Sequence, residues 1–157
     1  MTVSAPFAEV FEFFQDPRNL ERITPPWLNF KILNPEQVVM RKGELIDYVI
    51  RWMGVPLKWR TRIADYAPPT MFIDEQIRGP YSLWHHTHTF EETASGVRIL
   101  DQVDYRLPLG LLGTIAHAVM VKSQLLQIFR YRQAVIAKIL DKDAAIGEVA
   151  VSPLQAA

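Results

Sequence analysis

The chain has 157 residues, 49% of them hydrophobic and 22% charged, which predicts a single domain large enough to bury a core. It has 17 basic and 17 acidic residues and no cysteine. Disulfides, thiol catalysis and thiolate metal sites are therefore excluded, and the overall charge favours neither nucleic acid nor an anionic membrane. Residues 1–6 lack the features of a signal peptide, and no segment approaches the ~20 apolar residues of a membrane span, so we expect a soluble cytoplasmic protein without stable membrane insertion.

The N-terminal region predicts a pair of short helices. Pro6 suits the first position of a helix, and apolar side chains follow at helical spacing: Phe7, Val10, Phe11 and Phe14. Asp16-Pro17 ends this helix, and residues 19–23 can form another helical turn. The following Thr-Pro-Pro-Trp at 24–27 is rigid and cannot continue a helix. We interpret it as a shaped loop, with a cavity lid as the alternative.

From residue 30 the hydrophobic period changes to two, which is typical of strands. Short breaks rich in Gly, Pro and Asn separate the runs, so an antiparallel meander is the simplest topology. The predicted strands span residues 30–33, 44–53, 57–66, 71–78, the run from the Gly79-Pro80 turn to residue 90, and 97–107.

A long helical pattern follows the strands and ends at residue 140. It indicates a helix of about 28 residues, or ~40 Å at 1.5 Å per residue, long enough to cross a small sheet. On it, Arg130 and Arg132 are expected to form surface or edge ion pairs. We predict one domain over residues 1–142 and a disordered tail over residues 143–157. The order of elements predicts an α+β fold in which a curved antiparallel sheet holds the helix, with a cavity between them.

Three of the four histidines lie in the run from residue 79 to residue 90. Strand side chains alternate between faces, so one face of this run carries two histidines and two aromatic residues: Trp84, His86, His88 and Phe90. The aromatic residues mark this face as buried. Buried imidazoles need polar partners, because an unpaired buried polar group is costly.

The flanking strands supply candidate partners. The turn at residues 79–80 places Asp74 opposite His86, and the next turn places Asp101 opposite His88. Directly opposite side chains have Cβ atoms ~4.5–5.5 Å apart, close enough to interact, although a slip of one residue would undo both pairs. We predict a ligand-binding set on this inner face: Tyr48, Trp59, Asp74, Gln76, Trp84, His86, His88, Asp101 and Tyr105.

Three interpretations of the two His–Asp pairs stay open. They could satisfy one another and serve only the structure, or form the polar end of an apolar pocket. A carboxylate-oriented His86 or His88 could also act as a general acid or base, with Asp74 and Asp101 as orienting partners. Two histidines and a carboxylate are conceivable metal ligands. However, each histidine has a nearby aspartate and no second ligand motif stands out, so we expect no metal and no cofactor.

Several segments carry a resemblance to a known family. They are Phe-Phe-Gln-Asp-Pro-Arg-Asn-Leu at 13–20, Thr-Pro-Pro-Trp at 24–27, the run 74–90 around its histidines, Asp101, Tyr-Arg-Leu-Pro at 105–108 and Ile-Phe-Arg-Tyr-Arg at 128–132. Together they are similar to the START/SRPBCC superfamily, in its bacterial polyketide cyclase/dehydrase-like branch, over about residues 5–140. The resemblance implies a helix-grip fold with a deep hydrophobic cavity; its motifs are not a signature of any reaction.

This resemblance implies that the chain binds a small hydrophobic molecule, lipid-, polyketide- or aromatic-like, between sheet and helix. The alternative is a cyclase or dehydratase-type enzyme that uses His86 or His88. A third class is an interaction module that works through the sheet edge. Family members usually carry a full first strand, whereas about five residues precede the first helix here, so the edge strand is short or the start lies upstream. A short edge would leave its neighbour open to pairing, including in a homodimer.

Overall fold

The computed structural model describes residues 1–108, 120–140, 147, 149–150 and 152–153. The strands are β1 (Thr2–Val3), β2 (Lys31–Ile32), β3 (Leu45–Trp52), β4 (Val55–Ala67), β5 (Met71–Arg78), β6 (Leu83–Thr93), β7 (Gly96–Arg106) and β8 (Ser152–Pro153). The helices are α1 (Phe7–Gln15), α2 (Asn19–Ile23), the short 3-10 helix η1 (Pro26–Leu28) and α4 (Lys122–Leu140).

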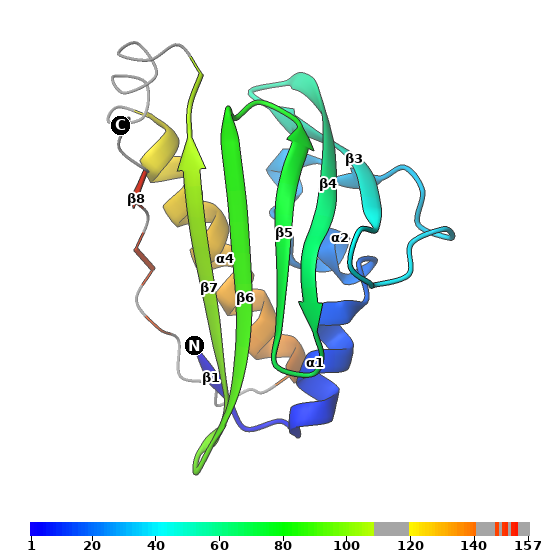
Figure 1. The fold of residues 1–157 in the computed structure, drawn as a ribbon. Coiled ribbons are helices and arrows are strands. Elements are labelled where there is room, and N and C mark those ends of the chain that lie inside the picture. Colours follow the sequence, from blue (N-terminus) through cyan, green and yellow to red (C-terminus); the bar gives the residue numbers. More distant parts are fainter. Residues whose placement is uncertain (109–119, 141–146, 148, 151, 154–157) are drawn as a thin grey trace.

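One sheet forms the front layer of the molecule, and α4 crosses behind it (Figure 1). The strand order is β1-β7-β6-β5-β4-β3-β2, with β8 beside β7. Every pair is antiparallel except β7 with β8. Consecutive strands from β2 to β7 are neighbours, so the predicted meander and the α+β helix-grip fold are confirmed.

The N-terminal helix pair forms as the sequence predicts. Helix α1 starts after Pro6 and ends at Asp16, because the following proline cannot continue it. It buries Val10, Phe11 and Phe13 rather than the whole expected stripe. Phe14 is only half-buried, yet its ring centroid lies 5.0 Å from that of Phe90 on β6, which fastens α1 to the sheet.

The sheet bends where β4 pairs with β5. Irregularities in the register lie between Arg60 and Thr61 and again between Ile63 and Asp65, and such bulges bend a strand and increase its twist. Trp59, Thr61 and Ile63, which alternate along one face of β4, are buried.

Helix α4 covers the concave face of the sheet. It buries Leu125, Phe129, Ile136 and Ala137, which follow helical spacing. Ile136 belongs to the main core with residues of α1, β6 and β7, and Leu125 packs on Tyr105. The earlier part of the predicted helix, up to residue 119, lies outside the described residues. No helix in the described part of the chain combines the length and apolar character that a bilayer crossing requires.

Two short strands border the outer edge of β7. β1 pairs through Thr2 with Arg98 and through Val3 with Val97, which agrees with the expected short edge strand. β8 pairs in parallel, with Ser152 beside Asp104. Two residues of the predicted tail thus form a strand at the edge of β7. Residues 141–146, 148, 151 and 154–157 of the predicted tail lie outside the described residues.

Candidate functional site

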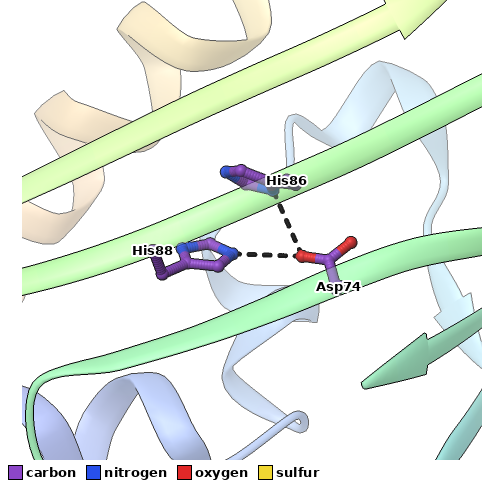
Figure 2. Close-up of side chains that lie close together, drawn as sticks. All are labelled: Asp74, His86 and His88. Atoms are coloured by element: carbon purple, nitrogen blue, oxygen red, sulfur yellow. Dashed lines mark hydrogen bonds and ion pairs between the residues drawn. The ribbon is translucent and has the colours of Figure 1, made fainter. Parts of the chain in front are cut away.

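The predicted register of the histidine strand is confirmed. Asp74 of β5 lies opposite His86, and Asp101 of β7 lies opposite His88. Figure 2 shows both imidazoles on the same side of β6, directed toward Asp74. Both histidines are buried, with 3% of His86 and 6% of His88 exposed, because the α1 and α4 helices cover this face of the sheet.

The four side chains form one cluster rather than the two separate pairs that we expected. Oδ2 of Asp74 lies 3.3 Å from Nδ1 of His86 and 3.1 Å from Nε2 of His88. Oδ1 of Asp101 lies 3.3 Å from Nε2 of His86 and 2.7 Å from Nδ1 of His88. The imidazole centroids are only 3.8 Å apart, so each carboxylate reaches both rings.

The cluster holds charge inside the protein. Burial disfavours the charged form of His86, but the neighbouring Asp74 and Asp101 outweigh it and raise the pKa of His86 to about 9. Burial likewise opposes the charged carboxylates, but both histidines hold the pKa of Asp74 and of Asp101 well below the usual range. At neutral pH a positively charged His86 therefore lies between two carboxylates, which offset its desolvation.

Asp74, His86 and His88 could each offer one ligand atom to a metal ion, since these atoms lie within 4.8 Å of one another. A metal would have to displace the proton that the carboxylates hold on His86, so its affinity would rise with pH. As proton carriers instead, the histidines have the orienting carboxylates that general acids and bases require.

A cavity of about 400 Å³ lies between the sheet and α4. Its walls are mostly aromatic and aliphatic, and three predicted ligand-binding residues belong to them: Tyr48, Trp59 and Trp84. The rings of Tyr48 and Trp59 stack with centroids 5.7 Å apart, and Trp84 meets Trp59 edge-on at 5.4 Å. Thr24, the first residue of the Thr-Pro-Pro-Trp segment, and Leu28, which directly follows it, also line the cavity, which supports the alternative that this segment closes it.

A smaller cavity of about 100 Å³ adjoins the His–Asp cluster and is lined by all four of its residues. The two cavities share five wall residues: Phe30, Tyr48, Trp84, Phe129 and Arg132. The polar cluster therefore borders the inner side of an apolar space.

Gln76 and Tyr105 line neither of these two cavities. The Gln76 amide donates to the carbonyl oxygen of Tyr81 at 2.6 Å and accepts from its N–H at 3.2 Å, so it braces the turn before β6. Tyr105 is completely buried and packs on Leu125. The alternation that predicted the inner face does not distinguish residues that line a cavity from residues that fill the core.

Sequence reasoning missed the contribution of α4. Gln124, Leu125, Phe129 and Arg132 line the larger cavity, and Trp52 donates a hydrogen bond to Gln124 across it. Arg132 is not in a surface ion pair as predicted; it faces both cavities, and no described carboxylate pairs with it. The sequence did contain a pattern that indicates the inward position of Arg132, because positions 125, 129, 132 and 136 follow one helical stripe.

Solved structures of the same fold come from several bacteria. Protein CV1439 from Chromobacterium violaceum matches with 16% identity and a TM-score of 0.66, over 91% of this chain and 94% of that one. Protein Ms6760 from Mycobacterium smegmatis matches with 17% identity and a TM-score of 0.65, over 89% and 87%. TTHA0849 from Thermus thermophilus matches with 14% identity and a TM-score of 0.62, over 90% and 91%. No curated protein matches the chain.

A family model described as polyketide cyclase/dehydrase and lipid transport matches residues 3–130. The match begins at Val3 in β1 and covers the helices α1 and α2, the strands β2 to β7 and the first half of α4. It thus includes both cavities' main walls, and its description indicates the binding of hydrophobic ligands. Because it spans most of the chain, the protein belongs to this SRPBCC-type polyketide cyclase/dehydrase and lipid transport family.

Proposed function

We propose that the protein binds a small hydrophobic molecule, lipid-, polyketide- or aromatic-like, in the larger cavity between the sheet and α4. The observation that carries this proposal is the apolar space of about 400 Å³. Ligand sites typically have volumes of about 300–1,000 Å³, with apolar walls and a few placed polar groups. The family to which the chain belongs supports the same class of ligand.

An apolar fluorescent probe and one cavity-filling variant test this proposal. Ile50 on β3 lines the cavity, whereas Leu45 on the same strand is exposed to solvent. We expect one probe molecule per chain, about tenfold weaker binding to Ile50→Trp, whose indole would occupy the cavity, and unchanged binding to Leu45→Trp. Fluorescence titration measures the affinity, and circular dichroism checks the fold of both variants. Equal affinity of the two variants would place the probe outside this cavity.

A cyclase or dehydratase-type enzyme is the second candidate, because the His–Asp cluster borders the shared wall of the two cavities. In this role His86 or His88 would transfer a proton to or from a bound enolisable or hydroxylated molecule. A separate experiment distinguishes the two candidates. A molecule that copurifies with the protein is extracted, and its mass is followed during incubation with the protein. An unchanged mass supports a binding protein, whereas conversion that His88→Gln abolishes while folding is retained supports the enzyme.

A further inference from the structure

Arg132 carries a positive charge at the wall of a mostly apolar space. It continues the helical stripe of Leu125 and Phe129 on α4 and lines both cavities. Its Nε atom is buried without a hydrogen-bond partner, and among the described residues the guanidinium has no ion pair. A charged group in such surroundings is costly unless an opposite charge or acceptor pairs with it.

The acidic residues of the His–Asp cluster do not fill this role. Asp74 and Asp101 line the smaller cavity, but their carboxylates face His86 and His88 at 2.7–3.3 Å. The contact that Arg132 makes is with the ring of Phe129, whose centroid lies 5.6 Å from its Cζ. A cation over an aromatic face gains some attraction, yet the N–H donors of the guanidinium fork remain available to an acceptor.

Other donors lie in the wall of the larger cavity. Nε1 of Trp59 and Oγ1 of Thr24 are buried and have no hydrogen-bond partner in the described part of the chain. Only 7% of each of these residues is exposed. Trp59 can only donate, as can Arg132. The unpaired donors of this wall, including the positively charged Arg132, therefore suit a ligand that accepts hydrogen bonds and bears negative charge.

We infer that the ligand is an amphiphilic organic acid whose carboxylate pairs with Arg132 while its apolar body occupies the larger cavity. This inference rests on the proposed function, because it names the class of molecule bound at the same site. A carboxylate suits the planar guanidinium, which can bind both of its oxygens. A fatty acid and an aromatic acid share this head group, and the experiment distinguishes them.

Four probes and a matched pair of variants test the inference by calorimetric titration. The probes are dodecanoic acid and 2-naphthylacetic acid, each with its methyl ester, which keeps the apolar body and removes the charge. The variants are Arg132→Gln and Arg130→Gln; Arg130 lies two residues earlier on α4 and is exposed. We expect at least one acid to bind roughly tenfold to a hundredfold more tightly than its ester, to wild type and to Arg130→Gln. For Arg132→Gln the ratio should fall to about one.

The outcomes distinguish a failure of the carboxylate inference from a failure of the proposed hydrophobic binding. Equal affinity of acid and ester in the wild type, or an unchanged ratio in Arg132→Gln, overturns the carboxylate and leaves hydrophobic binding intact. Failure of all four probes to bind overturns the proposed function along with it. If Arg132→Gln does not fold, Arg132→Lys replaces it: loss of the bidentate fork should lower the acid-to-ester ratio, and an unchanged ratio overturns the role of Arg132.

Discussion

At the scale of single residues, the His–Asp cluster stabilises the folded chain, because its carboxylates offset the cost of burying a charged histidine. His86 is almost fully buried, and its pKa is raised to about 9 by carboxylates that outweigh its desolvation. A histidine whose pKa is higher in the folded than in the unfolded chain binds its proton more tightly when folded. Its contribution to stability is complete below about pH 6.5 and is lost as the pH rises through about 9.

We therefore predict that the free energy of unfolding falls between pH 6 and pH 9.5 more steeply in the wild type than in His86→Gln. The difference of about 2.5 pKa units corresponds to roughly 3 kcal/mol. Urea unfolding at the two pH values measures it. His85→Gln is the control, because His85 is half-exposed and lies on the opposite face of β6.

Parallel pH dependences of the wild type and His86→Gln would mean that His86 is not protonated within the cluster. If His86→Gln does not fold, an NMR titration of the wild-type imidazole gives the same answer. Its resonance should then titrate near pH 9 rather than near the ordinary value for histidine of about 6.5.

The positions of these four residues in the sheet could be predicted from the sequence, because strand alternation and short turns constrain the register. Two turns were enough to place Asp74 opposite His86 and Asp101 opposite His88. The register could not reveal that one carboxylate reaches both rings, because that depends on how the imidazoles pack. Arg132 was missed for a different reason: a charged residue suggests solvent, and only its position on the stripe of α4 indicated otherwise.

At the scale of elements, β1 depends on the glycine at the first position of β7, directly after the turn from β6. Gly96 has φ +124°, a conformation that favours glycine, and a Cβ there would overlap the carbonyl oxygen of Val3 and lie 2.9 Å from Cα of Ser4. The chain after β1 therefore crosses directly over this turn. Gly43 provides a comparison, since its φ is +87° but no atom lies within 4 Å of its added Cβ.

We predict that Gly96→Ala lowers the free energy of unfolding by about 2 kcal/mol more than Gly43→Ala does. Both substitutions strain the backbone, at a cost of about 1–3 kcal/mol, but only Gly96→Ala also pushes the chain after β1 off the turn. Chemical denaturation measures the difference, and hydrogen exchange at Val97 and Ile99 should become faster in Gly96→Ala alone. Equal destabilisation by the two substitutions would contradict the close crossing.

Element boundaries were predictable to different degrees. The limits of β5 and α2 match the expected ranges, since Pro and Gly residues mark the chain around both. The strand predicted over residues 30–33 is reduced to β2, two residues long, and beyond it only the N–H of Leu33 still donates to the carbonyl oxygen of Asp47 on β3. Backbone pairing, which no local pattern encodes, decides the length of such an edge.

At the scale of the whole molecule, the order of elements was sufficient to predict a curved sheet around a long helix. The size and composition of the cavity were not predictable in the same way. They depend on where α4 crosses the sheet, and on the irregular register of β4 with β5, which bends and twists the strands. The pairing of β8 with β7 was equally inaccessible, because the final residues show no hydrophobic period.

We predict that two copies of the protein associate weakly through the edge of β7. β1 occupies the edge at Val97 and Arg98, and β8 occupies it at Asp104 and Tyr105. Between them, residues 100–103 have no strand neighbour on this side in the described part of the chain, while Gly147 lies close to Met1 and Val149 packs on the Tyr105 cluster. Open strand edges favour pairing with another copy, but so short a stretch would bury far less than the roughly 1,200 Å² of a stable interface. We therefore expect association only at high concentration.

Sedimentation velocity over about 10 to 500 µM tests this homodimer, with one lysine placed at the open edge and one placed away from it. Leu100, of which 43% is exposed, lies in the open stretch, and Leu45, of which 40% is exposed, lies on the distant strand β3. The sedimentation coefficient should rise with concentration for the wild type and for Leu45→Lys. It should stay constant for Leu100→Lys, because two lysines brought together across the edge repel each other. A constant coefficient in the wild type would show that β1 and β8 already protect the edge, whereas a rise in Leu100→Lys equal to the wild type would place the contact elsewhere on the molecule.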